Sequence, residues 1–167
     1  MSKRVYCVRH AKSDWGDPLM QDHDRPLNKR GLAAAPEMGK RLADFGASPD
    51  KIICSTAKRA HMTAELIAGE IGFDPAAIEV ERSIYTGDDE TYIGYLQRLP
   101  AAINEAMLVG HNPIMTLVVN KLANANIDNI VTCGIACIDF EIEDWQDLDA
   151  GKGTLVFYDF PKNASAP

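Results

Sequence analysis

The sequence has no long hydrophobic run and no excess of positive charge. No stretch approaches the roughly 18 apolar residues of a membrane-spanning helix, and the apolar run behind Lys3 and Arg4 is too short for a signal peptide. With 17 Lys and Arg against 24 Asp and Glu, the formal net charge is −7, the wrong sign for a general nucleic-acid-binding surface. These absences predict a cytoplasmic protein that binds neither membranes nor nucleic acid.

Motifs for disulfides, metals and nucleotides are also lacking. The four cysteines form no Cys-x-x-Cys pair, and they are expected to be small buried thiols in a reducing compartment. The four histidines form no His-x-x-x-His pair, and there is no Gly-x-x-x-x-Gly-Lys loop. The sequence therefore predicts no metal site and no P-loop nucleotide site.

What the chain does contain is an alternation of strand-like and helix-like segments over 167 residues. Short apolar runs typical of buried strands lie at 5–8, 51–55 and 106–110. Helical periodicity appears at 27–45, 56–71, 89–99 and 112–122. A strand pair is expected at 134–142 and 154–160, a short edge strand at 78–81 and a flexible tail at 162–167. Strands that alternate with helices predict a single α/β domain with a mostly parallel sheet.

The first predicted helix has the clearest boundaries. Asn28 is expected as its N-cap and Gly46 as its C-terminal stop. An apolar face repeats at three and four residues from Leu32 to Phe45. Pro36 lies inside this pattern and predicts a kink or an interruption.

Cationic side chains follow each of the three buried strands. Arg9 and His10 end the first, Arg59 lies in the first helical turn after the second, and His111 follows the third. The carboxyl ends of parallel strands share one edge of the sheet, where ligands bind, so we expect these side chains to converge. Two guanidinium and two imidazole groups suit a phosphoryl group, because Arg clamps its oxygens and a neutral His can attack phosphorus.

Each of these residues also has an ordinary structural interpretation. Charged residues after a strand are often solvated, and a His before a helix that starts at Asn112 can be a polar loop residue. In the polar loop 11–26, Arg25 either reaches back to an anion or pairs with Asp22 or Asp24. The local patterns alone leave these alternatives open.

Four motifs, in this order, resemble the histidine phosphatase superfamily, also called phosphoglycerate mutase-like. They are Val8-Arg9-His10-Ala11-Lys12-Ser13, Asp24-Arg25-Pro26-Leu27-Asn28-Lys29-Arg30-Gly31, Ser55-Thr56-Ala57-Lys58-Arg59-Ala60 with Thr63, and Val109-Gly110-His111-Asn112-Pro113. The first two look specifically like the SixA-type branch, the protein phosphohistidine phosphatases. Ala11 departs from the pattern, because a Gly follows the His in most members. The resemblance covers about residues 3–120.

The resemblance implies a three-layer α/β/α domain over residues 1–167 and a phosphatase that uses no metal or organic cofactor. It implies that His10 attacks phosphorus and becomes a phosphohistidine, while Arg9, Arg59 and His111 hold the phosphoryl oxygens. The other ring nitrogen of His10 is then expected to donate a hydrogen bond to a backbone carbonyl. Further contacts with a bound substrate are expected from Lys12, Ser13, Arg25 and Asn112.

The general acid is where the sequence departs from many superfamily members. The comparable region offers Asp88, Asp89 and Glu90, without a clean motif match, and acids at a helix start also have a dipole explanation. SixA-type proteins resemble this chain in lacking the standard acid. An imidazole leaving group, with a pKa near 6.5, departs easily once protonated, whereas an alcohol needs a positioned acid. The missing acid therefore favours a phosphoramidate substrate.

Three functions follow as alternatives. The first is removal of the phosphoryl group from phosphohistidine on a protein, for example a histidine-containing phosphotransfer domain. The second is hydrolysis of a small phosphomonoester by the same mechanism. The third is a phosphate- or phosphoprotein-binding module without turnover, which the four intact core residues disfavour. A short chain without a long insertion over the site suits a protein surface and disfavours a mutase.

Overall fold

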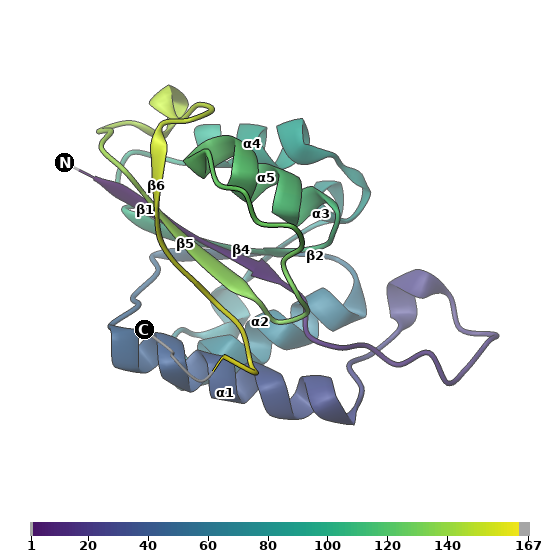
Figure 1. Ribbon diagram of the computed structural model, residues 1–167. Coiled ribbons are helices and arrows are strands. Elements are labelled where there is room, and N and C mark those ends of the chain that lie inside the picture. The colour runs from purple at the N-terminus through teal and green to yellow at the C-terminus, as the bar shows by residue number, and fades with distance from the viewer. Residues whose placement is uncertain (1, 164–167) are drawn as a thin grey trace.

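The computed structural model describes residues 2–163, which are built around one six-stranded sheet with the strand order β3-β2-β4-β1-β5-β6 (Figure 1). The strands are β1 (Lys3–Arg9), β2 (Lys51–Ser55), β3 (Glu79–Glu81), β4 (Glu105–Gly110), β5 (Ile135–Phe140) and β6 (Gly153–Asp159). Strands β3, β2, β4 and β1 are parallel, whereas β5 runs antiparallel to both β1 and β6. The predicted parallel sheet, edge strand and C-terminal strand pair are confirmed.

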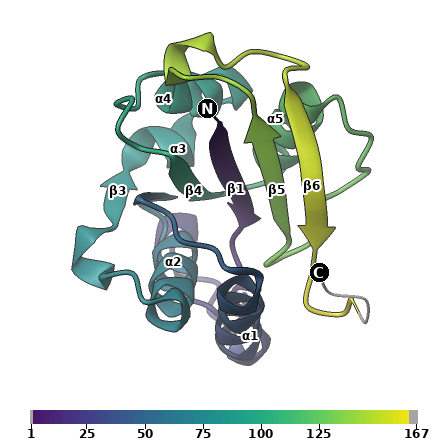
Figure 2. The same cartoon turned by 90° about the vertical axis from the view of Figure 1, so that its left-hand side faces the viewer.

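Helices cover both faces of the sheet (Figures 1 and 2). On one face lie α1 (Lys29–Phe45) and α2 (Lys58–Ile71), and on the other lie α3 (Arg82–Thr86), α4 (Asp89–Gln97) and α5 (Ile114–Ala123). Alternate side chains of β1 enter the two cores: Val5 and Cys7 pack on the α4–α5 side, and Tyr6 and Val8 on the α1–α2 side. The fold is therefore the expected three-layer α/β/α arrangement.

The position of β1 in the middle of the sheet follows from its apolar sequence. Val5, Tyr6, Cys7 and Val8 are fully buried, as expected for a strand covered by helices on both faces. Strand β1 lies between β4 and β5 and runs parallel to β4. Its last residue, Arg9, therefore lies at the carboxyl edge of the parallel strands. This edge carries the candidate site.

Helix α1 begins and ends where predicted. Oδ1 of Asn28 accepts a hydrogen bond from the Gly31 N–H at 2.9 Å, and Gly46 adopts a left-handed conformation with φ of 93°. The predicted interruption at Pro36 is wrong, because α1 runs on through this residue. Leu32 was also misplaced, since it is 47% exposed.

The reason that α1 tolerates its proline lies in the packing on either side of it. Ala35, Met38 and Leu42 are buried against the sheet and α2. A Cβ on Gly39 would lie 2.8 Å from the Cβ of Glu70, so the two helices approach closely there. This tertiary packing outweighs the one intrahelical hydrogen bond that Pro36 cannot make.

Two short elements have no counterpart among the segments predicted from the sequence. One is helix α3 (Arg82–Thr86), whose Ile84 is buried and whose Ile84 carbonyl accepts a hydrogen bond from the Tyr92 hydroxyl at 2.8 Å. The long connection at 143–150 contains a 3₁₀ turn, η3 (Trp145–Asp147), and buries the Trp145 indole completely. Both are too short to show a periodicity of their own.

The four cysteines are free and buried, as predicted. Among residues 2–163, no helix is long and apolar enough to cross a membrane. Residues 164–167 of the predicted tail lie outside the part of the chain that the structure describes.

Candidate active site

A cavity of about 600 Å³ lies at the carboxyl ends of β1, β2 and β4. The eight residues proposed from the sequence as catalytic or substrate-binding all line it: Arg9, His10, Lys12, Ser13, Arg25, Arg59, His111 and Asn112. Trp15, for which the sequence left open a place at a pocket mouth or an ordinary packed position, also lines it. Four further lining residues were not proposed: Asp22, Asn28, Tyr85 and Thr132. The parallel topology brings together side chains that are up to about a hundred residues apart in the sequence.

His10 has the geometry of a nucleophile. Its Nδ1 lies 2.7 Å from the backbone carbonyl oxygen of Ala11. Because a carbonyl oxygen can only accept, Nδ1 carries the proton and Nε2 keeps its lone pair. Burial, together with nearby Arg59 and Arg9, lowers the pKa of His10 to about 4. The imidazole is therefore neutral at pH 7.

The Thr63 hydroxyl links the backbone that follows His10 to helix α2. Oγ1 of Thr63, in α2, accepts a hydrogen bond from the Ala11 N–H at 3.0 Å and donates one to the Arg59 carbonyl at 2.7 Å. This explains the place of Thr63 in the third motif. The φ of Ala11 is not left-handed, unlike those of Asn124 and Cys133 among residues 2–163, so the position does not require glycine.

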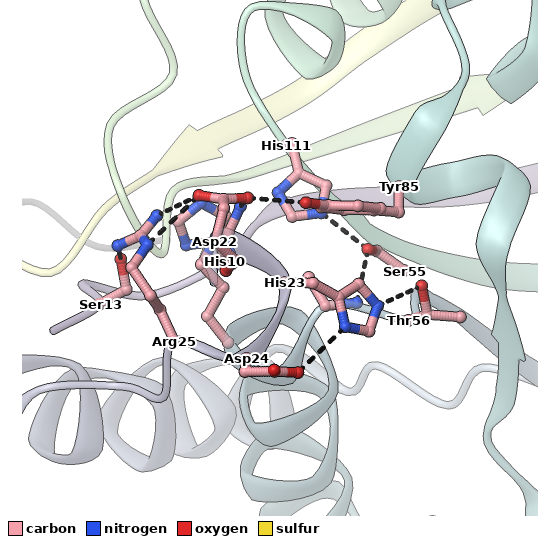
Figure 3. Close-up of polar contacts among 12 residues, drawn as sticks. His10, Ser13, Asp22, His23, Asp24, Arg25, Ser55, Thr56, Tyr85 and His111 are labelled. Atoms are coloured by element: carbon pink, nitrogen blue, oxygen red, sulfur yellow. Dashed lines mark hydrogen bonds and ion pairs between the residues drawn. The ribbon is translucent and has the colours of Figure 1, made fainter. Parts of the chain in front are cut away.

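His111 lies opposite His10, with 5.2 Å between the ring centroids. Its Nε2 is 2.7 Å from Oγ of Ser55, the last residue of β2 (Figure 3). Its backbone N–H donates to the Tyr92 hydroxyl at 3.2 Å. That hydroxyl would be only 2.6 Å from a Cβ on Gly110, so this position has to be glycine. Burial lowers the pKa of His111 to about 3.

The half-buried Arg9 and the buried Arg59 bring positive charge to the cavity. Nη1 of Arg9 donates to the Ile130 carbonyl at 2.9 Å, and Arg59 is 6% exposed. The Nε–H groups of both guanidinium groups are buried without a hydrogen-bond partner among residues 2–163. An unpaired buried donor costs roughly 1–3 kcal/mol. An anion bound between these groups would give them acceptors.

Among residues 2–163, Asp22 is the one carboxylate that lines the cavity. It belongs to a 3₁₀ turn, η1 (Asp22–Asp24), in the long loop after β1. Its carboxylate accepts hydrogen bonds from Arg25, Arg59 and Tyr85 (Figure 3). Although partial burial alone would raise it, the hydrogen bonds from Tyr85, Arg25 and Arg59 hold the pKa of Asp22 well below its usual range. The sequence indicated Asp22 only as an alternative partner of Arg25.

Arg25 pairs with Asp22, which was one of the two alternatives that the sequence left open. Its Nε and Nη2 donate to Oδ1 of Asp22 at 3.2 and 3.0 Å, and its Nη1 donates to Oγ of Ser13 at 2.6 Å. The guanidinium carbon lies 3.5 Å from the ring centroid of Trp15, a cation–π contact. Arg25 lines the cavity but is held by protein groups.

Asn112 is similarly engaged, whereas Lys12 is exposed. Oδ1 of Asn112 accepts hydrogen bonds from the N–H and hydroxyl of Thr116, and its Nδ2 donates to Asn129 and Ile130. Asn112 thus satisfies the Thr116 N–H in the first turn of α5, but the helix does not start at Asn112 as expected: it begins at Ile114, and its N-cap is Pro113. Lys12 is exposed to solvent and lines the cavity.

Asp88, Asp89 and Glu90, the candidate general acids, are not among the residues that line the cavity. The carboxylate of Asp88 accepts from the Thr91 N–H at 3.0 Å and forms a capping box at the start of α4. Asp89 lies 3.4 Å from Lys121 of α5, and Glu90 is exposed in the first helical turn. The local helix start accounts for all three acids.

Changing any one of Asp88, Asp89 or Glu90 to its amide is therefore expected to cost little activity. We expect kcat/KM with phosphohistidine to fall by less than about threefold, far below the roughly 10²–10⁴-fold that loss of a general acid causes. Steady-state kinetics of the three variants measures this. A hundredfold loss in any of them would identify that carboxyl as the acid and favour the phosphomonoester alternative.

The buried histidines predict a specific dependence of stability on pH. Their folded pKa values, about 4 for His10 and about 3 for His111, lie below the unfolded value of 6.5. Between these values the unfolded chain binds more protons, so the free energy of unfolding falls as the pH falls below 6.5. At about 1.4 kcal/mol per pKa unit, His10 alone accounts for roughly 3 kcal/mol by pH 4.

Urea denaturation at pH 7, 6 and 5 tests this expectation, since the lowered carboxyl pKa values act only below about pH 4. The double variant with His10→Gln and His111→Gln is expected to have a flatter profile than the wild type. Equal slopes for the two proteins would contradict the buried neutral histidines.

Among residues 2–163, no three His, Cys, Asp or Glu side chains are grouped so that they could hold a metal ion. The cationic side chains in the cavity can supply the charge that a transferring phosphoryl group needs. The arrangement combines a neutral imidazole that can act as a nucleophile, two guanidinium groups and a second imidazole.

Comparisons with known proteins agree with this arrangement. The model of the histidine phosphatase superfamily, branch 1, matches residues 5–95. An uncharacterised chloroplastic protein of Arabidopsis thaliana is 30% identical over 161 residues, which cover 92% of this chain and 73% of that protein.

Solved structures give the same result. The protein assigned as the phosphohistidine phosphatase SixA of Agrobacterium tumefaciens matches with a TM-score of 0.80 at 30% identity, over 95% of this chain and 98% of that one. A protein histidine phosphatase SixA complexed with tungstate has a TM-score of 0.81 over 95% of this chain and 97% of that one, and at 22% identity this match speaks for the fold alone.

Proposed function

Because the chain belongs to the histidine phosphatase superfamily and is a phosphatase, we propose that it removes the phosphoryl group from phosphohistidine on a protein. The observation that carries this proposal is a cavity with a neutral nucleophile and several cations that is lined, among residues 2–163, by no protonated carboxyl group. Its one carboxylate, Asp22, is ionised, and its phenol, Tyr85, has its pKa raised by burial and by Asp22.

The chemistry of the leaving group connects this cavity to phosphohistidine. An alkyl phosphate leaves as an alkoxide, which needs a positioned acid. A phosphorylated imidazole that is protonated on its other nitrogen leaves as neutral imidazole, and its pKa near 6.5 makes that protonated form accessible at neutral pH. A cavity whose one described carboxyl group is ionised therefore favours the second kind of bond.

In the proposed first step, Nε2 of His10 attacks phosphorus and the P–N bond of the substrate breaks. The substrate imidazole leaves neutral, with its electron pair, and His10 becomes a phosphorylated imidazolium because Nδ1 keeps its proton. The Ala11 carbonyl, 2.7 Å from Nδ1, stabilises that positive ring. Arg9, Arg59 and His111 hold the phosphoryl oxygens, whose charge grows in the transition state.

In the second step, water attacks the phosphorus of phosphorylated His10 and the Nε2–P bond breaks. His10 returns as neutral imidazole, and both protons of the water leave on inorganic phosphate. Since the leaving group is again an imidazole with a protonated Nδ1, this step also needs no separate acid. In both chemical steps the leaving group is therefore an imidazole, and the site has to stabilise the charge on the phosphoryl oxygens.

A second cavity supports a substrate attached to a protein. It measures about 550 Å³ and shares Lys12 and Thr132 with the first cavity. The exposed face of α1, the loop before β5 and the residues after β6 form its walls, which include Ala33, Val131 and Phe160. Lys12, Arg30 and Lys162 add positive charge in a chain whose net charge is −7. Residues that flank a phosphohistidine could bind there if they are apolar and acidic.

A comparison of substrates tests the proposed function. We expect kcat/KM to fall in the order phosphohistidine on a histidine phosphotransfer domain, phosphohistidine in a short peptide, and sugar or glycerol phosphates. The esters are expected to react at least about 10²-fold more slowly than the peptide, the lower end of what a general acid contributes. A higher kcat/KM for an ester would favour a small-molecule phosphomonoesterase. Phosphate binding without turnover of any substrate would favour a binding module.

The variant Arg30→Glu tests whether the second cavity binds the protein substrate. Arg30 lies in the first turn of α1, where an acid suits the helix dipole, so the fold should tolerate the change. We expect a several-fold loss of kcat/KM with the phosphorylated domain and none with the peptide. Lys40→Glu, at an exposed position of α1 outside both cavities, is the matched control. Equal effects on the two substrates would exclude this role of the second cavity.

A further inference from the structure

The Asp22 carboxylate links three side chains that come from different parts of the fold. Its Oδ1 accepts from Nε and Nη2 of Arg25, and its Oδ2 accepts from Nη2 of Arg59 at 3.0 Å and from the Tyr85 hydroxyl at 2.8 Å. The backbone carbonyl of Asp22 accepts from Nη1 of Arg59 at 2.7 Å. Asp22 therefore contacts the loop after β1, the start of α2 and helix α3 at once.

The contacts between Asp22 and Arg59 use only one edge of the guanidinium group. A guanidinium is a rigid planar fork with five N–H donors. Nη1 and Nη2 both donate to Asp22, one to its backbone and one to its side chain. The other edge consists of Nε–H and the second N–H of Nη2, and Nε has no partner among residues 2–163. Asp22 thus fixes the plane of Arg59 and leaves a bidentate edge for an anion.

We propose that Asp22 is a positioning residue for the phosphatase reaction, which holds the outer edge of Arg59 so that its Nε edge binds the phosphoryl group at His10. Arg25 belongs to the same device. It donates to Oδ1 of Asp22, is fixed by Ser13 and contacts the Trp15 ring, so it supports Asp22. Tyr85 supports the other carboxylate oxygen (Figure 3).

The position of Arg59 in the helix explains why it needs such a support. Arg59 is the second residue of α2, where the helix dipole disfavours a positive side chain. The Asp22 carboxylate supplies the negative charge that this end of a helix favours, and it stays when the phosphoryl group leaves. Arg59 can therefore keep one orientation through the catalytic cycle, which lowers the reorganisation needed in each turnover.

Electrostatic repulsion alone predicts that the Asp22 carboxylate weakens anion binding, which is the opposite of what the positioning role predicts. A negative charge beside an anion site repels a phosphoryl dianion, so its removal should strengthen binding if Asp22 had no positioning role. The two roles therefore differ in the sign of the change that Asp22→Asn causes. This makes the proposal testable by a single neutral substitution of nearly the same shape.

The test measures kcat and KM of Asp22→Asn with a phosphohistidine peptide, together with inhibition by vanadate. We expect kcat/KM to fall by about 10–100-fold, mainly through kcat, and vanadate to bind more weakly. Asp24→Asn is the matched control, because Asp24 lies in the same turn and carries the same charge but contacts His23 at 3.5 Å. That variant is expected to stay within about twofold of the wild type.

A second variant separates positioning from a general loss of structure. If Asp22 acts through Arg59, then Asp22→Asn should change kcat/KM by less than about threefold in an Arg59→Lys background, where the fork is already absent. Unchanged or higher kcat/KM in Asp22→Asn, tighter vanadate binding, or the same loss in the Arg59→Lys background would each overturn the proposal.

The role assigned to Arg59 comes from the proposed function, but the two can fail separately. A wild-type protein that does not hydrolyse the phosphohistidine peptide would refute the proposed substrate. Vanadate binding would still show whether Asp22 orients Arg59, because it depends on the anion site and not on the leaving group.

Discussion

Replacing His10 with Ala is expected to abolish turnover and to prevent any covalent phosphorylation of the protein. Removal of a covalent nucleophile lowers rates on the order of 10⁴-fold or more in other hydrolases. His10 is 8% exposed and lines the cavity together with Arg9 and Arg59. The second imidazole, His111, is engaged through its Nε2 with Oγ of Ser55 at 2.7 Å, so we expect no substitute for His10 there. The measurement is the initial rate with a phosphohistidine peptide, with incorporation of labelled phosphate measured in parallel.

His10→Gln is a second variant for the same experiment, because it fills more of the ring's space than Ala does. Thermal denaturation of both variants checks that a loss of activity does not reflect unfolding. Wild-type-like turnover in a folded His10 variant would contradict the proposed nucleophile. Covalent labelling of such a variant would show that another residue accepts the phosphoryl group.

The second large effect is expected for Arg59→Gln. Loss of one preorganised donor to developing charge costs about 10²–10³-fold in rate, and Arg59 offers two donors along its Nε edge, so we expect a loss of about 10³-fold in kcat/KM. Gln can occupy part of the buried space but has neither the charge nor the fork. Arg98→Gln, at an exposed position after α4, is the control. A loss of less than tenfold in Arg59→Gln would place the phosphoryl group elsewhere.

The fold could be predicted from the sequence where a signal repeats over many residues. The apolar run of β1, the caps of α1 at Asn28 and Gly46, and the alternation of strands with helices each indicate one structure. Since parallel strands end at a common edge, the same reasoning brings Arg9, His10, Arg59 and His111 to one cavity without any knowledge of the loops.

What the sequence could not predict depends on contacts between distant segments. Asp22 and Tyr85 are 63 residues apart, and the hydrogen bond between them depends on the tertiary placement of η1 and α3. Helix α3 has only five residues, fewer than two turns, so it gives no periodic signal. Whether Arg25 binds substrate or Asp22 was equally open, because both choices satisfy a buried guanidinium.

The sequence also could not decide the role of three acids, Asp88, Asp89 and Glu90. Three acids in a loop before a helix are compatible with an active-site acid and with helix capping, and only the packing of α4 against α5 decides where they lie. Their place outside the cavity strengthens the link between the site and an easily protonated leaving group.

The measurement that tests the central claim most directly is the chemical identity of the phosphorylated intermediate. The protein is mixed with a phosphohistidine peptide, quenched in alkali within milliseconds, digested, and the modified residue and ring position are identified. Because Nδ1 of His10 donates to the Ala11 carbonyl at 2.7 Å, we predict phosphate on Nε2 of His10, formed and lost at rates compatible with kcat. Phosphate on another residue, on Nδ1, or a single-step hydrolysis without any phosphoenzyme would contradict the account.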